Sequence, residues 1–459
     1  MDTDAIPQKV KAEFAAKKKA QADAKKAVKA QPKPATRAAR PVYWDSGMPS
    51  ETLTKTVLIH FSGPDAPGLT TEFTAILAHH NVSILDIGQA VVHETLALGM
   101  LLEVPSGSSL TSLRAALTDR AHELGLQAHF KVIPKDAVNH WVHGLHHDHF
   151  IITVLGRSIT AGQLARVSGI IAAHGMNIDR IDRLSGELTP EAAPANACVE
   201  LAVSGDASRE LPMRAEFLAA AQQLSIDIAF QRESIFRRNR RLFAFDMDST
   251  LIQGEVIDEL AKLAGVGDLV ARITEAAMRG ELGFDESFAR RLALLKGLPA
   301  ERVHSLLETI PLAEGAERLV QTLRLLGYKT AILSGGFNFF ARSLQQRLGI
   351  DTVHANELEI IAGEVTGRVI PPIINGQRKA ELLAEIARSE GISLEQVVAV
   401  GDGANDIPML NLAGMGIAYR AKPLVRQKAD QSISSLGLDG LLYLVGVRDR
   451  DIQPHEPLP

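Results

Sequence analysis

The sequence LFAFDMDST, residues 242–250, joins a short apolar run to two aspartates that are one residue apart. The run from Leu242 to Phe245 predicts a buried strand, which places Asp246 and Asp248 at the edge where open α/β sheets bind ligands. The two-residue period of a strand directs both carboxylates to one side. One carboxylate can attack phosphorus while the other donates a proton to the leaving oxygen. By itself, Asp-x-Asp more often forms a turn or caps a helix.

Two segments further along the chain supply other parts of a phosphoryl-transfer site. TAILSGG, residues 330–336, predicts an apolar strand that ends at Ser334 and two glycines, whose backbone N–H groups could approach phosphate oxygens closely. Lys379 precedes a helical pattern at residues 380–390, and its ammonium could neutralise charge on a phosphoryl group. The plain alternatives are a strand-to-helix turn and a solvated surface lysine.

A third segment, VVAVGDGAND at residues 397–406, is an apolar run that leads into an acidic turn. Carboxylates separated by small residues suit a hard divalent cation, and Mg²⁺ typically uses one or two carboxylates together with phosphate oxygens and water. Asp402 and Asp406 are therefore candidate metal ligands. The alternative is an acidic turn without a metal.

Together these segments resemble the four motifs of the haloacid dehalogenase superfamily of phosphotransferases. FDMDSTLI at residues 245–252, SGGF at residues 334–337 and GDGAND at residues 401–406, with Glu255, are similar to the phosphoserine phosphatase family within it. The resemblance implies an α/β fold, with a Rossmann-like parallel sheet and a small helical cap. It also implies Mg²⁺-dependent hydrolysis of O-phosphoserine to serine and phosphate, the last step of serine biosynthesis.

The resemblance further implies roles for the aspartates. Asp246 would be the nucleophile that forms an aspartyl-phosphate. Asp248 would protonate the serine oxygen and later activate water. Mg²⁺ would be held by Asp246, by the backbone carbonyl of Asp248 and by Asp402, and Asp406 would orient the water molecules on the metal.

Phosphate binding would fall to the other motifs. By the same resemblance, Ser334 and the Gly335 N–H would bind phosphate oxygens. Asn405 would position either the phosphate or Lys379. Most of the expected catalysis is then positioning and neutralisation of charge.

The predicted cap, residues 254–311, carries candidate contacts for the rest of phosphoserine, which has an ammonium and a carboxylate besides its phosphate. Glu255 could accept the ammonium, and the planar fork of Arg291 could hold the carboxylate bidentately. Met278 and Phe284 would supply apolar walls. These positions line the substrate pocket in the family, and the residues here match it; without the resemblance, Arg291 would be an ordinary solvated arginine.

The region from Thr56 to Lys131 alternates strand, helix, strand, strand, helix and strand, and the same order recurs from Phe150 to Phe230. Helices are expected at residues 69–80 and 110–124 in the first copy. Such repetition predicts two copies of one βαββαβ ferredoxin-like module.

Both copies resemble ACT domains, small modules that sense amino acids. Asp65, Gly68 and Asn81 match the loop pattern of that family, and Asn177 stands in the similar turn of the second copy. The resemblance implies that serine could bind here as a feedback effector. The alternative is a scaffold that forms a homodimer through sheet edges.

The length of 459 residues and the 46% hydrophobic content suggest about three domains. Residues 1–40 hold eleven Lys/Arg and four Asp/Glu, about +7, so a net charge of −5 leaves about −12 for the rest. We expect a flexible basic arm at residues 1–50, ACT-like domains at 54–135 and 147–232, and a phosphatase domain at 240–448. The arm is expected to be a solvated tail, with nucleic acid or anionic lipid contact as the less favoured alternative.

A single cysteine, Cys198, excludes an internal disulfide framework and suits a reducing compartment. The sequence also lacks the apolar stretch of about 18 residues that a membrane span needs. We therefore expect a cytosolic enzyme with no membrane or nucleic acid partner. Two rival hypotheses remain: a related phosphatase or phosphotransferase with another substrate, and a non-catalytic amino-acid sensor with a vestigial phosphatase domain.

Overall fold

The computed structural model describes residues 54–134, 148–186, 196–279 and 281–452, which belong to two compact units, residues 1–143 and 144–459. The predicted basic arm and nearly all of the stretch between the two predicted ACT-like domains lie outside the described residues. Within the described ranges, we find no helix with both the length and the apolar character of a membrane span.

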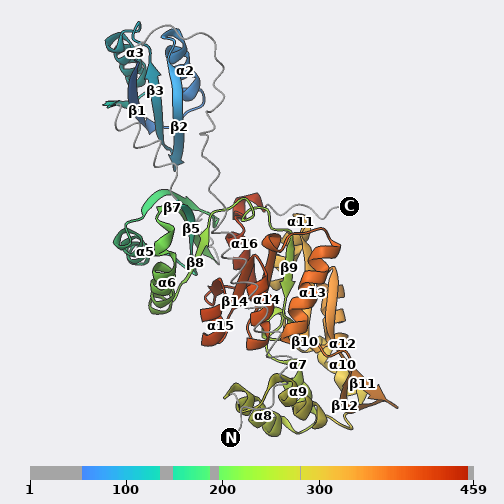
Figure 1. The fold of residues 1–459 in the computed structure, drawn as a ribbon. Coiled ribbons are helices and arrows are strands. Elements are labelled where there is room, and N and C mark those ends of the chain that lie inside the picture. The colour runs from blue at the N-terminus through green and yellow to red at the C-terminus, as the bar shows by residue number, and fades with distance from the viewer. Residues whose placement is uncertain (1–53, 135–147, 187–195, 280, 453–459) are drawn as a thin grey trace, which may run out of the picture. The chain divides into compact units, whose positions relative to one another are not determined.

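The first unit contains one βαββαβ module (Figure 1). Its sheet is antiparallel, in the order β2-β3-β1-β4. One face of the sheet is apolar, because Val57, Ile59 and Phe61 alternate along the first strand, and both helices pack on it. Its elements are β1 (Lys55–Pro64), α2 (Leu69–His79), β2 (Ser83–Val92), β3 (Thr95–Val104), α3 (Leu110–Glu123) and β4 (Gln127–Ile133). The predicted order of elements is confirmed.

The second unit opens with a second module of the same topology, whose sheet order is β6-β7-β5-β8. Its elements are β5 (Asp148–Gly156), α5 (Ala161–Ala173), β6 (Asn177–Arg183), β7 (Ala197–Gly205), α6 (Glu210–Leu224) and β8 (Asp227–Arg232). Thr160 begins α5 with a capping box. Unlike β1, strand β5 is buried on both faces, because Leu155 joins the core of the following domain while Val154 packs under the helices of the module.

The C-terminal domain is built on a seven-stranded sheet in the order β12-β11-β10-β9-β13-β14-β15, in which only β12 runs antiparallel to its neighbour. The strands are β9 (Leu242–Phe245), β10 (Lys329–Phe337), β11 (Thr352–Ile361), β12 (Glu364–Ile370), β13 (Val397–Gly401), β14 (Met415–Tyr419) and β15 (Gln431–Ile433). The predicted strand over residues 242–245 is therefore the central strand, and all four of its residues are buried.

Helices cover both faces of this sheet, as expected for a Rossmann-like domain. On one face, α11 (Ala316–Leu325) and α12 (Asn338–Leu348) pack against Phe243 and Phe245. On the other, α13 (Gly376–Ser389), α14 (Ile407–Leu412) and α15 (Pro423–Lys428) pack against Leu242 and Ala244. Successive β9 side chains thus point to opposite faces of the sheet and contribute to the core on each side.

The segment between β9 and α11 is helical, as predicted for a cap, and Figure 1 shows α8 and α9 apart from the sheet. It contains α7 (Val256–Leu263), α8 (Gly267–Met278), α9 (Phe284–Ala293) and α10 (Ala300–Ser305). An isolated bridge between Ile252 and Leu312 closes its base. The cap therefore enters and leaves the domain next to the end of β9.

Candidate active site

Asp246 and Asp248 lie where β9 leaves the sheet, and both are held by backbone N–H groups. The Asp246 carboxylate accepts a hydrogen bond from Met247 N at 2.7 Å, and Asp248 Oδ1 accepts one from Val256 N, the first residue of α7, at 2.8 Å. Ser249 adopts a left-handed conformation with φ 55°, which turns the chain sharply after the strand. Both aspartates are buried.

Lys379 is fully buried between two carboxylates. Its Nζ lies 2.9 Å from Asp246 Oδ1 and 2.7 Å from Asp406 Oδ1. Burial alone would lower the pKa of Lys379, but the charges of Asp246 and Asp406 outweigh it and raise the pKa above its usual value. The ammonium therefore stays charged.

The prediction that Lys379 precedes its helix is wrong. Helix α13 begins at Gly376, because the Asn375 side chain caps it by accepting a hydrogen bond from Arg378 N. Lys379 thus stands in the first helical turn, which aims it from one face of the sheet at the end of β9.

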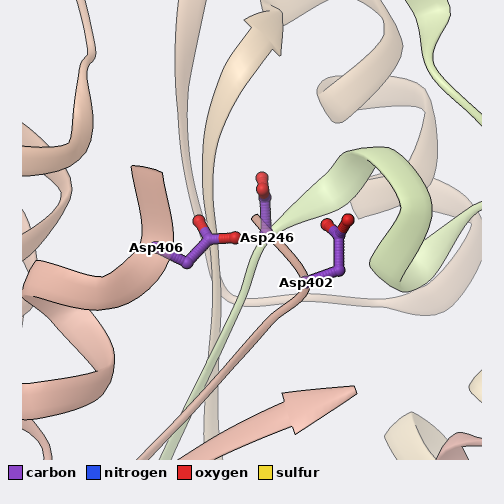
Figure 2. A group of neighbouring side chains, drawn as sticks. All are labelled: Asp246, Asp402 and Asp406. Carbon is purple, nitrogen blue, oxygen red and sulfur yellow. The ribbon is translucent and has the colours of Figure 1, made fainter. Parts of the chain in front are cut away.

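Asp246, Asp402 and Asp406 form an acidic cluster in which a carboxylate oxygen of each lies within 4.8 Å of the others (Figure 2). Burial and the neighbouring carboxylates raise the pKa of Asp402 to about 8 and that of Asp406 to about 7. A divalent cation would relieve this repulsion, and oxygen ligands of this kind suit a hard ion. The residues present therefore fit a metal site.

Asp406 has little freedom left for direct metal binding. Its Oδ1 accepts from Lys379 Nζ, and its Oδ2 accepts from Gly403 N at 2.9 Å. A side chain at Gly401 would collide with it, since a Cβ there would lie 2.5 Å from Asp406 Cγ. The glycines of the GDGAND turn therefore allow Asp406 to fold back under the strand end.

The segment predicted to bind phosphate, Ser334–Gly336, forms the last part of β10, so the strand runs on past the predicted end at Ser334. The buried Ser334 Oγ accepts a hydrogen bond from Gly336 N at 2.9 Å. A Cβ at Gly336 would overlap Asp248 Oδ2 and lie 2.7 Å from Met247 Cε. This close approach of the Ser334–Gly336 backbone to Asp248 requires glycine at position 336. Asn405 lies half-buried in the acidic turn opposite.

Asn356 is a supporting residue that sequence reasoning missed. It is buried in β11, its Nδ2 donates to the Gly335 carbonyl at 2.8 Å, and its Oδ1 accepts from Ile374 N at 2.7 Å. It therefore ties the Ser334–Gly336 segment to the loop before α13. Its position 21 residues after Gly335 offers no local signal that could have identified it.

In the cap, Glu255 is the residue before α7, and its Oε1 accepts a hydrogen bond from Ser249 Oγ at 3.0 Å. Burial and the charge of Asp246 raise the pKa of Glu255. Arg291 lies half-buried on α9, where the charges of Glu255, Asp258 and Asp248 act on it. Met278 ends α8 and Phe284 begins α9, but their side chains lie outside the described part of the structure.

The candidate effector residues lie in the two N-terminal modules. Asp65 and Gly68 lie between β1 and α2, where Gly68 has φ 94°, and Asn81 follows α2 with φ 52°. Asn177 is not its counterpart: it is the first residue of β6, and Gly175 with φ 70° occupies the left-handed position after α5. The structural counterpart of Asn81 is therefore Gly175, two residues before Asn177.

Comparison with known proteins places this architecture in a family. A model of haloacid dehalogenase-like hydrolases matches residues 243–411, and two ACT domain models match residues 55–131 and 148–231. Phosphoserine phosphatase SerB2 of Mycobacterium tuberculosis is 41% identical over 86% of this chain and 94% of its own length. The chain belongs to the phosphoserine phosphatase family.

Phosphoserine phosphatase of Streptomyces coelicolor is similarly close, with 40% identity over 88% of this chain and 95% of its own length. A crystal structure of a probable phosphoserine phosphatase from Vibrio cholerae, in unliganded form, superimposes with a TM-score of 0.52 at 33% identity, and covers 67% of this chain and 90% of that one. The resemblances to haloacid dehalogenases, to phosphoserine phosphatases and to ACT domains are therefore confirmed, as is the fold class.

Proposed function

We propose that this phosphoserine phosphatase family member hydrolyses O-phosphoserine to serine and phosphate through an aspartyl-phosphate at Asp246, as the last step of serine biosynthesis. The observation that carries the proposal is the fully buried Lys379, which holds Asp246 at 2.9 Å within a cluster of three aspartates. A buried lysine between carboxylates neutralises charge on a nucleophile and on the phosphoryl group it attacks.

Asp248 is the proposed acid and base. Burial, with the charges of Glu255 and Asp246, raises the pKa of Asp248 well above its usual value, so it keeps a proton to higher pH than an ordinary aspartate. Its Oδ1 is engaged by Val256 N, while its Oδ2 faces the backbone of Gly336. That proton can pass to the serine oxygen as Asp246 forms its bond to phosphorus, and Asp248 can then take a proton from the attacking water.

We propose Mg²⁺ as the cofactor, held by Asp246, Asp402 and the Asp248 carbonyl. When bound, it would neutralise charge on the phosphate and the nucleophile. Asp406, with both oxygens engaged by Lys379 and Gly403 N, would orient water on the metal. The raised pKa values of Asp402 and Asp406 support this proposal, because a cation would favour their charged forms.

The remaining groups would bind the substrate. Ser334 Oγ and the Gly335 N–H would contact phosphate oxygens, with Asn405 and Lys379 beside them. Glu255 would accept the ammonium and Arg291 the carboxylate of phosphoserine. Their opposite charges at the cap match the two ends of that amino acid. Met278 and Phe284 would complete the apolar walls.

Phosphate release from O-phosphoserine is the decisive measurement. We expect activity with Mg²⁺, loss of activity in excess chelator, and loss of at least about a thousandfold in Asp246→Asn, because the amide cannot form the acyl phosphate. Activity that persists in Asp246→Asn would reject the nucleophile. The parent enzyme and Arg291→Ala are then compared on phosphoserine and on phosphate esters that lack a carboxylate. If Arg291→Ala does not reduce the preference for phosphoserine over these esters, the natural substrate is a different one.

For the N-terminal modules we propose binding of serine as a feedback effector, with Asp65, Gly68 and Asn81 in the first module, and a homodimer formed through these modules. Exposed apolar side chains along the edge strand β2, among them Ile87 and Val92, support a dimer contact. Equal activity with and without millimolar serine would contradict feedback, and a monomer in sedimentation would contradict the dimer.

We also propose the division of the chain into a basic arm at residues 1–50, modules at 54–135 and 147–232, and a phosphatase domain at 240–448 with its cap at about 254–311. The family matches and the described elements support these boundaries.

A cytosolic location is proposed from the single cysteine, which is buried and unpaired.

A further inference from the structure

Three buried side-chain atoms of the cap have no hydrogen-bond partner within the described part of the chain, Asp258 Oδ1, Ser287 Oγ and Arg291 Nε, and the first and last belong to charged groups. Asp258 lies on α7, three residues after Glu255, and Arg291 lies on α9. Leaving buried donors and acceptors unpaired costs free energy, so such atoms mark places where a structure awaits a partner.

Three carboxylates act electrostatically on Arg291. Among the carboxylates that act on it, Glu255 acts most strongly, followed by Asp258 and Asp248. Conversely, burial raises the pKa of Asp258, and Arg291 is the cation that most opposes this rise. Across the described residues, no ion pair or hydrogen bond engages the Arg291 guanidinium.

Glu255 and Arg291 face a conflict, because they must bind opposite ends of one small zwitterion. If they paired with each other, both the ammonium site and the carboxylate site would be lost. Ser249 Oγ holds the Glu255 side chain in place through the 3.0 Å hydrogen bond that it donates to Oε1. Arg291 needs a comparable contact to keep it away from Glu255. Asp258 is a carboxylate whose charge acts on Arg291 and whose buried oxygen has no hydrogen-bond partner.

We propose that Asp258 is a positioning residue for Arg291: the two side chains form no ion pair in the described structure, but when phosphoserine binds Asp258 would engage one edge of the guanidinium, hold it away from Glu255 and leave the other edge for the substrate carboxylate. The five N–H donors of arginine lie in a planar fork, so one guanidinium can serve two carboxylates on different edges. The inference rests on the proposed function, since it concerns the carboxylate of phosphoserine.

The test compares Asp258→Asn with Glu259→Gln, a matched acid-to-amide change at the next residue of the same helix, where Glu259 pairs with Lys262 at the surface. The kcat and KM are measured for O-phosphoserine and for p-nitrophenyl phosphate, which lacks a carboxylate. We expect Asp258→Asn to raise KM for phosphoserine about tenfold with little change in kcat, because the guanidinium loses its orientation. The values for p-nitrophenyl phosphate, and all values for Glu259→Gln, should stay within about twofold of the parent.

Two further variants separate positioning from simple support of the fold. Asp258→Glu keeps the charge and should recover part of the phosphoserine KM. In an Arg291→Ala background, Asp258→Asn should add no further loss. Equal losses on both substrates, full additivity with Arg291→Ala, or an unchanged phosphoserine KM in Asp258→Asn would each overturn the proposal.

Failure of the proposed function gives a different pattern. A parent enzyme that hydrolyses p-nitrophenyl phosphate but shows no preference for phosphoserine would reject the substrate, and with it the role of Asp258. A parent that prefers phosphoserine while Asp258→Asn keeps that preference would reject only the role of Asp258.

Discussion

At the scale of single residues, the site depends on charges that are buried in contact with one another. Lys379 contacts Asp246 and Asp406 at 2.9 and 2.7 Å without solvent exposure. Burying a charge is unfavourable unless its partners compensate, so each of these groups is held by the others. The position of Asp246, the proposed nucleophile, is therefore set before any substrate arrives.

Gly336 has no room for a side chain beside the active-site aspartates. A Cβ in Gly336→Ala would overlap Asp248 Oδ2, so we expect phosphatase activity to fall by at least about a hundredfold as the acid is displaced. The matched control is Gly169→Ala in α5, where a Cβ meets nothing within 4 Å and where alanine should stabilise the helix by about 0.5–1 kcal/mol. Steady-state kinetics and thermal unfolding check both variants, and an active Gly336→Ala enzyme would contradict the close approach.

The acidic cluster predicts a linked dependence on pH and Mg²⁺. The folded-state pKa values of Asp402 and Asp406, about 8 and about 7, lie above the usual aspartate value of about 3.9. In the metal-free protein their stabilising contribution is present at low pH and is lost as pH rises through these values, because unfolding then relieves the repulsion.

Mg²⁺ should reverse this loss, since it favours the charged carboxylates. We expect its affinity to strengthen by up to about tenfold per pH unit between pH 6 and 7, where binding displaces a proton. Mg²⁺ should also raise the unfolding temperature more at pH 8.5 than at pH 6. Calorimetric titration and thermal unfolding at these pH values provide the check. A pH-independent affinity would show that the cluster does not bind the metal.

At the scale of elements, strand β8 of the second ACT module lies against β15 of the catalytic sheet. The Gln431 side-chain amide accepts a hydrogen bond from Phe230 N and donates one to Phe230 O, both at 2.9 Å. These are the two backbone groups that a neighbouring strand would otherwise pair with. Asp227 accepts from Ser434 N and Ser435 N, both at 2.8 Å. This module is therefore bound to the edge of the catalytic sheet by buried polar contacts.

Removing the Asp227 carboxylate should weaken this contact. We expect Asp227→Ala to lower the free energy of unfolding of the second unit by about 1–3 kcal/mol, because two buried N–H groups lose their acceptor. Glu233→Ala, at an exposed site that follows β8 in the same unit, is the control and should change stability by less than about 0.5 kcal/mol. Urea denaturation measures both. Equal stability of the two variants would mean that water replaces the lost acceptor.

At the scale of the whole molecule, the two ACT modules differ in how they use their sheets. The first forms a unit with its own apolar core. The second shares its core with the catalytic domain, since Leu155, Cys198 and Ala229 belong to the same cluster as Phe243 and Phe245. The second module is thus part of the structure that supports the catalytic sheet.

Truncation should expose this difference. A chain of residues 144–459 should fold and keep basal phosphatase activity within about threefold, because it retains that shared core. A chain that begins at residue 233 should unfold at lower temperature or aggregate, because it would expose the apolar surface that the second module covers. Thermal unfolding and phosphate release from O-phosphoserine distinguish the two chains, and comparable behaviour would contradict the shared core.

Much of the molecule follows from local pattern. The apolar run at Leu242–Phe245, the repeated βαββαβ order and the glycine-rich acidic turn predict the central strand, the two modules and the acidic cluster, because strand alternation and turn chemistry depend on near neighbours. The exceptions are instructive. The Asn375 cap begins α13 early enough to include Lys379, and Asn177, predicted in the similar turn of the second copy, lies in β6 instead.

The sequence by itself thus determined which segments form strands, which carry carboxylates and which family they resemble. The tertiary structure decided which side chains meet: Asn356 with Gly335, Gln431 with Phe230, and Lys379 with Asp246. The physical reason is that these contacts join residues from 21 to 201 positions apart. Periodicity describes the backbone of one segment, whereas such contacts form only when sheet packing brings the ends of separate strands together.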